Sequence, residues 1–382
     1  MKICFITTVP ITIRAFLLKT IEFLHENTDW ELFVLCDEDG VIRKELPDYI
    51  NYIPISMKRG ISIGGVKAML EMKRVFQKER FDMIQYSTPN ASFYASLAGK
   101  SAKIPVRLYC QWGIAYVGFS GLKRKVFKSV EKKVCSNSTW IEPDSRSNLE
   151  FSIGEGLYQK EKASVIWNGS ACGVDLCKFD IQRKPEWRKA IRGQYGIGKN
   201  DFVFCFVGRI TRDKGINELL RAFRVVFSEQ PNIWLFMVGV EEADGTVDSE
   251  LYAWSVKENH VIYTGFTKEV ETFLAASDCY VLPSYREGFG MGVVEAEAMG
   301  LPVIVTDIPG PVDAMIDKKT GIVIPKADER TLEQVMRGFL SEEYDLDMMS
   351  KSAEAFAEEC FEQGEFMGYL LEDRKNLLVE RG

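Results

Sequence analysis

The stretch from Cys279 to Gly310 has the order of a buried strand, a glycine-rich loop, a helix and a second buried strand. We predict strands over Cys279–Leu282 and Val303–Val305, and a helix over Val293–Met299 that ends at a Gly300 C-cap. A strand–helix–strand unit of this kind places its two strands in parallel, with the helix against the sheet. The stretch therefore predicts a parallel α/β fold for the part of the chain around it.

The loop from Glu287 to Gly292 predicts an anion-binding site, because its backbone N–H groups and the positive end of the helix dipole face the same space. Gly288 and Gly290 supply G-x-G, but Val293 occupies the position of the third glycine in the dinucleotide fingerprint, which therefore does not fit. Carboxylates flank the loop, with Glu287 before it and Glu295 expected in the first turn of the helix. Carboxylates accept hydrogen bonds from sugar hydroxyls, so the pattern favours a ligand that has both phosphate and hydroxyl groups. The alternative is an ordinary helix N-terminus, where glutamate is common.

Composition narrows the class of protein. The chain has 382 residues, 46% hydrophobic and 27% charged, which suits two globular domains. Apolar runs stay well short of a membrane span, and Arg14 interrupts the apolar N-terminus, so Lys2–Thr7 is predicted to be a first strand and not part of a signal peptide. Nine cysteines without a C-x-x-C pair indicate reduced thiols in the core of a cytoplasmic protein. Only two histidines are present, so we expect no metal site.

Short apolar strands alternate with helices along the whole chain, which predicts a doubly wound parallel sheet in each half. The alternation stops at a turn-rich connection that begins at Asn168-Gly169 and ends near Pro185, and then restarts. We predict strands over Lys2–Thr7, Glu31–Leu35, Asp82–Gln85, Pro105–Cys110, Thr139–Glu142, Ser164–Trp167, Phe202–Val207, Ile233–Val238, Val261–Thr264, Cys279–Leu282, Val303–Val305 and Ile322–Ile324.

A second motif, Gly208-Arg209 followed by Lys214-Gly215, lies at the predicted end of a strand in the second half. Ligands of doubly wound sheets bind beyond the carboxyl ends of the strands. Phe266 follows another predicted strand at the same edge. The alternatives are an Arg and a Lys on a surface loop, and a core aromatic at position 266. Arg212 and Asp213 are expected to be solvated loop charges.

These motifs resemble the retaining glycosyltransferases of the GT-B fold, family 4 (glycosyl transferases group 1), of the bacterial surface-polysaccharide type. The resemblance rests on Glu287-Gly288-Phe289-Gly290 with a second glutamate at Glu295, and on the Arg209 and Lys214 motif. It implies two Rossmann-like doubly wound domains facing a cleft: residues 1–180 bind the acceptor, residues 181–361 bind the nucleotide sugar, and a helix over residues 362–382 crosses back to the first domain.

The resemblance also implies roles for these residues. Arg209, Lys214 and Glu287 would be catalytic, with the two cations on the donor diphosphate in place of a metal ion and Glu287 on hydroxyls of the donor sugar. Glu295 would bind the ribose hydroxyls. The remaining donor-binding residues would be Gly208, Phe266, Gly288, Phe289, Gly290 and Met291.

The first domain departs from the family pattern. Where many members have a histidine before a glycine, this chain has Trp112 before Gly113, and Thr8-Val9 replaces a glycine pair. Gln111, Trp112 and Gly113 are the candidates for the acceptor side. Residues 54–133 carry a large excess of lysine and arginine, which with exposed Ile61 and Ile63 would suit an anionic membrane surface. Solvated helix faces are the alternative, and nucleic acid is not expected.

Taken together, these features predict a cytoplasmic glycosyltransferase, peripheral on the inner face of the cell membrane and independent of any cofactor. It would move a sugar from a nucleotide diphosphate, expected to be UDP, to a polyprenyl-diphosphate-linked glycan in capsule, O-antigen or exopolysaccharide synthesis. Two alternatives remain at this point: another GT-B-like enzyme such as a nucleotide-sugar epimerase, and a non-enzymatic two-domain sugar-binding protein.

Overall fold

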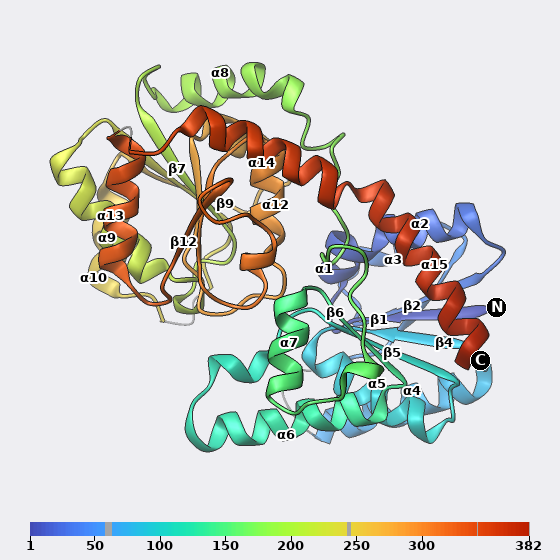
Figure 1. Ribbon diagram of the computed structural model, residues 1–382. Helices are drawn as coiled ribbons and strands as arrows, with labels where there is room; N and C mark the ends of the chain where they lie inside the picture. The colour runs from blue at the N-terminus through green and yellow to red at the C-terminus, as the bar shows by residue number, and fades with distance from the viewer. Residues whose placement is uncertain (58–62, 243–245, 342, 382) are drawn as a thin grey trace. The chain divides into compact units, whose positions relative to one another are not determined.

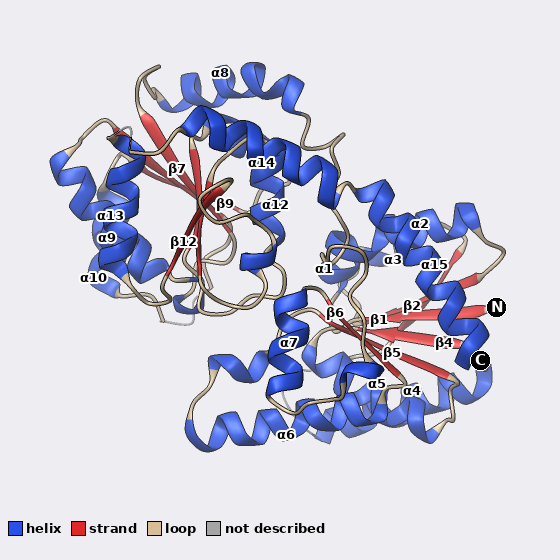
Figure 2. Ribbon diagram, viewed as in Figure 1, coloured by secondary structure: helices blue, strands red, loops and turns tan. Residues whose placement is uncertain are grey.

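The computed structural model describes residues 1–57, 63–242, 246–341 and 343–381. The chain divides into two compact units: unit 1 comprises Met1–Cys172 with Gly364–Gly382, and unit 2 comprises Gly173–Gln363. In each unit, helices cover both faces of one central sheet (Figures 1 and 2).

Unit 1 contains a six-stranded parallel sheet in the order β3-β2-β1-β4-β5-β6. Its strands are β1 (Lys2–Ile6), β2 (Glu31–Cys36), β3 (Ile50–Pro54), β4 (Met83–Tyr86), β5 (Val106–Gln111) and β6 (Trp140–Pro143). Its helices are α1 (Pro10–Thr12), the π-helical η1 (Ile13–Leu17), α2 (Leu18–Asn27), α3 (Ile42–Glu45), α4 (Ile63–Glu79), α5 (Pro89–Ser101), the 3₁₀ turn η2 (Ala115–Gly118), α6 (Gly121–Asn137), α7 (Arg146–Gly154), the 3₁₀ turn η3 (Lys160–Lys162) and α15 (Gln363–Arg381).

Unit 2 contains a second six-stranded parallel sheet, in the order β12-β11-β10-β7-β8-β9. Its strands are β7 (Phe202–Val207), β8 (Ile233–Val238), β9 (Val261–Gly265), β10 (Cys279–Leu282), β11 (Val303–Thr306) and β12 (Gly321–Ile324). Its helices are η4 (Ile181–Arg183), α8 (Lys184–Tyr195), η5 (Arg212–Lys214), α9 (Ile216–Glu229), α10 (Ser249–Lys257), α11 (Val270–Ala276), α12 (Met291–Ala298), η6 (Pro311–Asp313), α13 (Glu329–Leu340) and α14 (Leu346–Phe361).

The two sheets share one topology. Counted from the first strand of its own unit, each sheet has the order 3-2-1-4-5-6, with a reversal of direction between β1 and β4 in unit 1 and between β7 and β10 in unit 2. Ligands of such sheets bind outside the carboxyl ends of the strands at this reversal. The topology therefore marks one candidate position in each unit.

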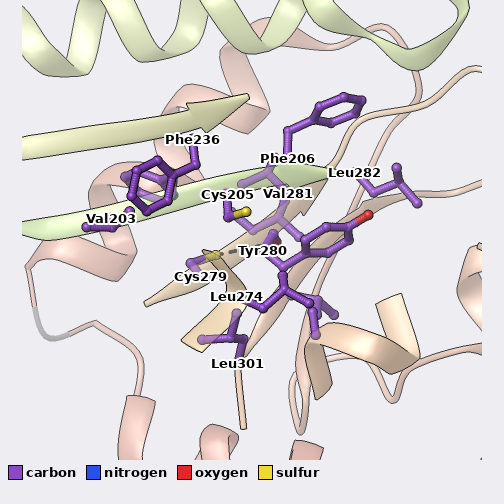
Figure 3. Packing of buried hydrophobic residues seen from close by; sticks show 14 of the residues in the cluster. Val203, Cys205, Phe206, Phe236, Leu274, Cys279, Tyr280, Val281, Leu282 and Leu301 are labelled. Carbon is purple, nitrogen blue, oxygen red and sulfur yellow. Dashed lines mark hydrogen bonds between the residues drawn. The ribbon is translucent and has the colours of Figure 1, made fainter. Parts of the chain in front are cut away.

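Continuous apolar strands form the core, as expected for parallel sheets covered on both faces. In unit 2, Phe206 of β7, Phe236 of β8 and Tyr280 of β10 are each no more than 1% exposed. They pack together with Leu274 from the preceding helix and with Leu301, so the loops that follow β7 and β10 start from fixed positions (Figure 3).

Helix α15 packs onto the unit 1 core through both apolar and charged contacts. Leu370 and Leu377 are buried there. Arg374, 1% exposed, forms a two-pronged ion pair with Glu142 of β6 and donates from Nε to Oε1 of Gln85 at 3.1 Å. Because a buried charge is stable only when it is paired, this contact fixes the position of α15 on the sheet.

The expected doubly wound parallel sheets are confirmed, with one predicted strand wrong and one missed. Ser164–Trp167 is not a strand: Trp167 has a positive φ of 48°, which breaks an extended chain, and only Ala163 makes a single bridge to Ile141. The strand that the sequence did not predict is β3. It lies at the edge of the sheet, and its half-exposed residues give no clear apolar pattern.

Helix α12 begins at Met291, earlier than Val293, because Gly290 has a φ of 90° and is its N-cap. Glu295 therefore lies in the second turn of the helix and not in the first.

Candidate active site

The two motifs come together at the carboxyl ends of neighbouring strands in unit 2. Strand β7 pairs directly with β10, and the motif loops follow these two strands. The first loop carries Arg209 and Lys214, and the second carries Glu287. The parallel register therefore places the two sets of charged residues side by side, at the sheet edge where the topology predicts a ligand.

Lys214 and Glu287 form the centre of this cluster. The Lys214 ammonium lies 2.6 Å from Oε1 of Glu287, and their side chains are only 18% and 10% exposed. The Ser284 hydroxyl donates to the same oxygen at 2.7 Å. Two donors thus converge on one carboxylate oxygen and hold it in place. Ser284 had no sequence signal beyond its position at the end of a strand.

Arg209 is the more exposed cation of the pair. Its guanidinium contacts Glu242 at 3.0 Å and Asp213 at 3.7 Å, and 44% of the side chain is exposed. Arg209 is therefore held by two carboxylates, and nearly half of its side chain remains open to solvent.

The expectation that Asp213 is a solvated loop charge is wrong. Its carboxylate is partly buried and pairs with Arg286 at 2.7 Å. Burial alone would raise the pKa of this carboxyl, but the Thr211 hydroxyl and the charges of Arg286, Arg209 and Lys214 lower it below its ordinary value. Asp213 therefore remains ionised and orients the cations around it. Arg212 is exposed, as expected.

Close backbone approaches lock the two loops. Gly215 has a φ of 73°, and a Cβ there would lie 2.0 Å from the carbonyl oxygen of Pro283 in the second loop. A Cβ on Gly310, with a φ of 104°, would lie 1.8 Å from the carbonyl oxygen of Gly288. Only glycine fits at these positions, which explains Gly215 at the end of the first motif and shows that Gly310, from the loop after β11, packs against the second.

The glycine loop leads into α12, whose N-terminus lies beyond the carboxyl end of β10. The Phe289 side chain is 2% exposed and its ring lies 5.2 Å from that of Phe361, so Phe289 can face a ligand only through its backbone. Gly288, Gly290 and Met291 complete this loop. The loop thus has the backbone arrangement that suits an anion at a helix N-terminus.

Glu295 lies on α12 in a partly buried setting. Burial raises the pKa of its carboxyl, the nearby Lys178 lowers it, and Glu271 raises it. Lys178 itself pairs with Glu271 at 3.8 Å. The sequence could not predict that Lys178 and Glu271 lie near Glu295, because both come from distant parts of the chain.

Phe266 follows β9 and is 63% exposed. The alternative of a core aromatic is therefore excluded. Gly208 lies between β7 and Arg209, and its N–H donates to the carbonyl of Val238 at 2.9 Å, so it continues the sheet and does not itself point a free N–H outward.

The three acceptor-side candidates lie in unit 1. Gln111 is completely buried: its Nε2 donates to Glu131 at 2.7 Å, and its Oε1 accepts from Ser152 at 3.1 Å and Tyr158 at 2.9 Å. Trp112 is partly buried and its ring lies 5.6 Å from that of Phe16, while Gly113 has a φ of 92°. Gln111 thus orients Glu131, and contact of these three residues with an acceptor stays a prediction.

No cluster of three or more His, Cys, Asp and Glu side chains placed for a metal ion occurs among the described residues. Within the same part of the chain, no helix combines the length and apolar character needed to cross a bilayer. Two isoleucines, Ile61 and Ile63, were expected to be exposed in the basic stretch. Residue 61 and the side chain of residue 63 lie outside the part of the chain that the structure describes.

The chain is similar in sequence to known glycosyltransferases. The model of the family Glycosyl transferases group 1 matches residues 188–356. The chain is 29% identical over 327 residues to the capsular polysaccharide biosynthesis glycosyltransferase CapM of Staphylococcus aureus, covering 85% of this chain and 83% of that protein. It is 28% identical over 295 residues to the UDP-Gal:alpha-D-GlcNAc-diphosphoundecaprenol alpha-1,3-galactosyltransferase of Escherichia coli, covering 74% and 73%.

A solved structure agrees with the fold. The crystal structure of Anabaena Alr3699/HepE in complex with UDP and glucose matches with a TM-score of 0.80 at 20% identity, over 98% of this chain and 100% of that one. Two parallel sheets of the same order in one chain are thus the GT-B fold. Residues 188–356 of the chain thus match the group 1 glycosyltransferases, and the protein is a glycosyltransferase of the GT-B fold.

Proposed function

We propose that this glycosyltransferase transfers a sugar from UDP to a lipid-diphosphate-linked glycan in the synthesis of a surface polysaccharide, with retention of anomeric configuration and without a metal ion. The observation that carries the proposal is the convergence of Lys214, Glu287 and Arg209 at the carboxyl ends of β7 and β10. The relatives support the substrate class, because one is named for capsule synthesis and the other for a UDP-sugar and a diphosphoundecaprenol-linked acceptor.

The charges of the cluster suit a leaving diphosphate. Negative charge grows on the diphosphate as the bond to the sugar breaks, so fixed cations beside it stabilise the transition state more than the ground state. Lys214 and Arg209 would supply these cations in the role that a metal ion has elsewhere, and the N-terminus of α12 would add partial positive charge. Glu287 would accept hydrogen bonds from the donor sugar, Glu295 from the ribose, and Phe266 would stack on the base.

Retention follows if the acceptor attacks on the face from which the diphosphate leaves. The acceptor oxygen forms a bond to the anomeric carbon, the bond from that carbon to the phosphate oxygen breaks, and the acceptor proton passes to that phosphate oxygen. No further nucleophile is then needed, and the cluster only has to hold the diphosphate close to the reacting carbon.

Helix α6 supports contact with an anionic membrane surface. Leu122 and Val126 are 77% and 48% exposed and lie four residues apart, and Lys133 follows Val126 at seven residues, so the three share one face. Lys125 and Lys132, also exposed, flank this face. Apolar residues among lysines are the pattern of a helix that lies in an anionic interface. Sedimentation with vesicles that contain phosphatidylglycerol should fall when Lys125, Lys132 and Lys133 are replaced by Gln; unchanged sedimentation would remove the membrane part of the proposal.

Ligand-induced thermal shift tests the donor assignment. UDP in the presence of EDTA should raise the melting temperature more than ADP or GDP, because a ligand that binds only the folded state stabilises it by mass action. Equal shifts from all three would refute the preference for uridine, and no shift from any of them would refute the donor site. A shift that requires added divalent metal would refute metal independence.

Two glutamate variants provide the matched comparison. Glu295→Ala should remove the UDP shift, whereas Glu186→Ala, on the exposed face of α8 in the same unit, should keep it.

For retention, the anomeric configuration of the transferred sugar is read from the product by NMR, and an inverted product would refute the same-face displacement.

A further inference from the structure

Unit 1 contains a small cavity near the carboxyl ends of β4 and β5, on one side of the reversal between β1 and β4. Its volume is about 40 Å³, and its wall comes from the first residues of α5, from η2 and from α6. Five aromatic rings line it: Phe93, Tyr94, Tyr109, Tyr116 and Phe127.

Besides the tyrosines, the polar residues that line the cavity are Asn90, Ser92 and Glu131. Ser92 lines the cavity, is 0% exposed, and its hydroxyl has no hydrogen-bond partner among the described residues. Glu131 also lines it and is 8% exposed. Tyr109 and Gln111 both donate to Oε1 of Glu131, at 2.8 and 2.7 Å, so Oε2 remains available to a ligand.

A strained residue comes immediately before the first residue of α5 in the cavity wall, Pro89. Thr88, immediately before α5, is a non-glycine residue with a φ of 69° and ψ of 140°. Its hydroxyl is held by the N–H and the hydroxyl of Thr8 at 3.0 and 2.8 Å. Backbone strain of this kind costs about 1–3 kcal/mol and gathers at ligand sites.

We propose that this cavity binds the acetamido group of the acceptor sugar, so that the enzyme acts on a 2-acetamido sugar at the end of its acceptor glycan. The inference rests on the proposed function, since it takes the acceptor to be a glycan. The methyl group would contact the aromatic rings, the amide N–H would donate to Glu131, and the Ser92 hydroxyl would donate to the carbonyl oxygen.

Size and polarity select this group. A single water needs roughly 10–15 Å³ of such volume, so the cavity suits a group of about three or four heavy atoms and is too small for a sugar ring. An acetamido group has four. An isoprenyl chain would leave the buried Ser92 hydroxyl without a partner, at an energetic cost. A phosphate would meet the Glu131 carboxylate. Burial raises the pKa of the Glu131 carboxyl, while the hydrogen bonds from Gln111 and Tyr109 act in the opposite direction.

Saturation-transfer NMR with three probes tests the proposal: the methyl α-glycosides of N-acetylglucosamine, glucose and glucosamine, added to the full chain with UDP present. We expect saturation of the acetyl methyl, and affinity for the acetamido probe at least about fourfold above glucose, which is the effect of burying one methyl group. Tighter binding of glucosamine would show a cation site, and no saturation of the methyl would show a cavity that holds only water. Either result overturns the proposal.

Ala115→Leu fills the cavity from η2, and Ala102→Leu at the far end of α5 is its matched control. The first variant should lose methyl saturation and the second should keep it. Retained saturation in Ala115→Leu would overturn the proposal. If Ala115→Leu does not fold, Ser92→Ala replaces it, since it removes only the hydroxyl and should lower acetamido affinity.

The UDP-induced thermal shift, which arises in unit 2, should be present in every folded variant. If UDP does not shift the melting temperature of the wild type, the donor assignment is wrong. If UDP does shift it but the acetyl methyl is not saturated, only the proposal for the cavity is wrong.

Discussion

The same sheet order ends in different chemistry in the two units. In unit 2, β7 and β10 are followed by loops that carry Arg209, Lys214 and Glu287. In unit 1, the equivalent strands β1 and β4 are followed by Thr8 and Thr88, whose hydroxyls bond to each other at 2.8 Å. The topology fixes where a ligand can bind, and the loops decide whether it is charged or neutral. This difference is the one expected if the donor diphosphate binds in unit 2 and an uncharged sugar of the acceptor binds in unit 1, as we propose.

The two units also differ in buried charge, because the most deeply buried ion pair among the described residues, Arg374 with Glu142, lies in unit 1. Arg374→Ala should reduce the free energy of unfolding by about 3–5 kcal/mol, since it leaves Glu142 buried and unpaired. Denaturant unfolding measures this loss. Replacing Arg374 by Met and Glu142 by Leu together should recover most of it. If the single variant is as stable as the wild type, the contact does not hold α15 in place.

Lys214→Met should lower the transfer rate by about 10²–10³-fold, because one donor to the developing negative charge is removed. The measurement is the rate of transfer from a UDP-sugar at saturating acceptor. Thr8→Val, at the equivalent place in unit 1, should change that rate by less than about tenfold, since a neutral hydroxyl stabilises much less charge. Equal losses in both variants would contradict the division of charge between the units.

Gly215→Ala should destabilise unit 2 by ~2 kcal/mol more than Gly196→Ala. Both glycines have positive φ, 73° and 69°, but only at Gly215 would the new Cβ meet a neighbouring backbone atom. The difference in thermal unfolding between the two variants measures the packing of the two motif loops. Equal destabilisation would mean that the Pro283 loop moves easily.

Glu297→Gln tests the buried carboxyl of α12, which is 0% exposed. Burial raises its pKa well above the ordinary value, while the Thr320 hydroxyl acts in the opposite direction. The folded protein therefore binds this proton more tightly than the unfolded chain, and stability falls as the pH rises above the unfolded pKa toward the folded one. The variant should raise the melting temperature by a few degrees at pH 8 and less at pH 5. An equal gain at both values would show that Glu297 does not titrate there.

Periodic patterns predicted most of the fold. The strands Phe202–Val207, Ile233–Val238 and Cys279–Leu282 have the predicted bounds, because strands buried on both faces are continuous apolar runs. The edge strand β3 gave no such run. The buried contact between Gln111 and Glu131 could not be predicted either, because the two residues lie on β5 and α6 and no local sequence pattern links them.

The sequence alone determined the parallel α/β class, the two motifs and the residue types that could bind a nucleotide sugar, since strand burial and glycine spacing are local properties. Only the tertiary structure decided that Asp213 holds the cations of the motif, that Gln111 is enclosed, and that an aromatic cavity lies beyond β4 and β5. These facts depend on which side chains distant parts of the chain bring into contact, and contact between distant residues is set by packing and not by local pattern.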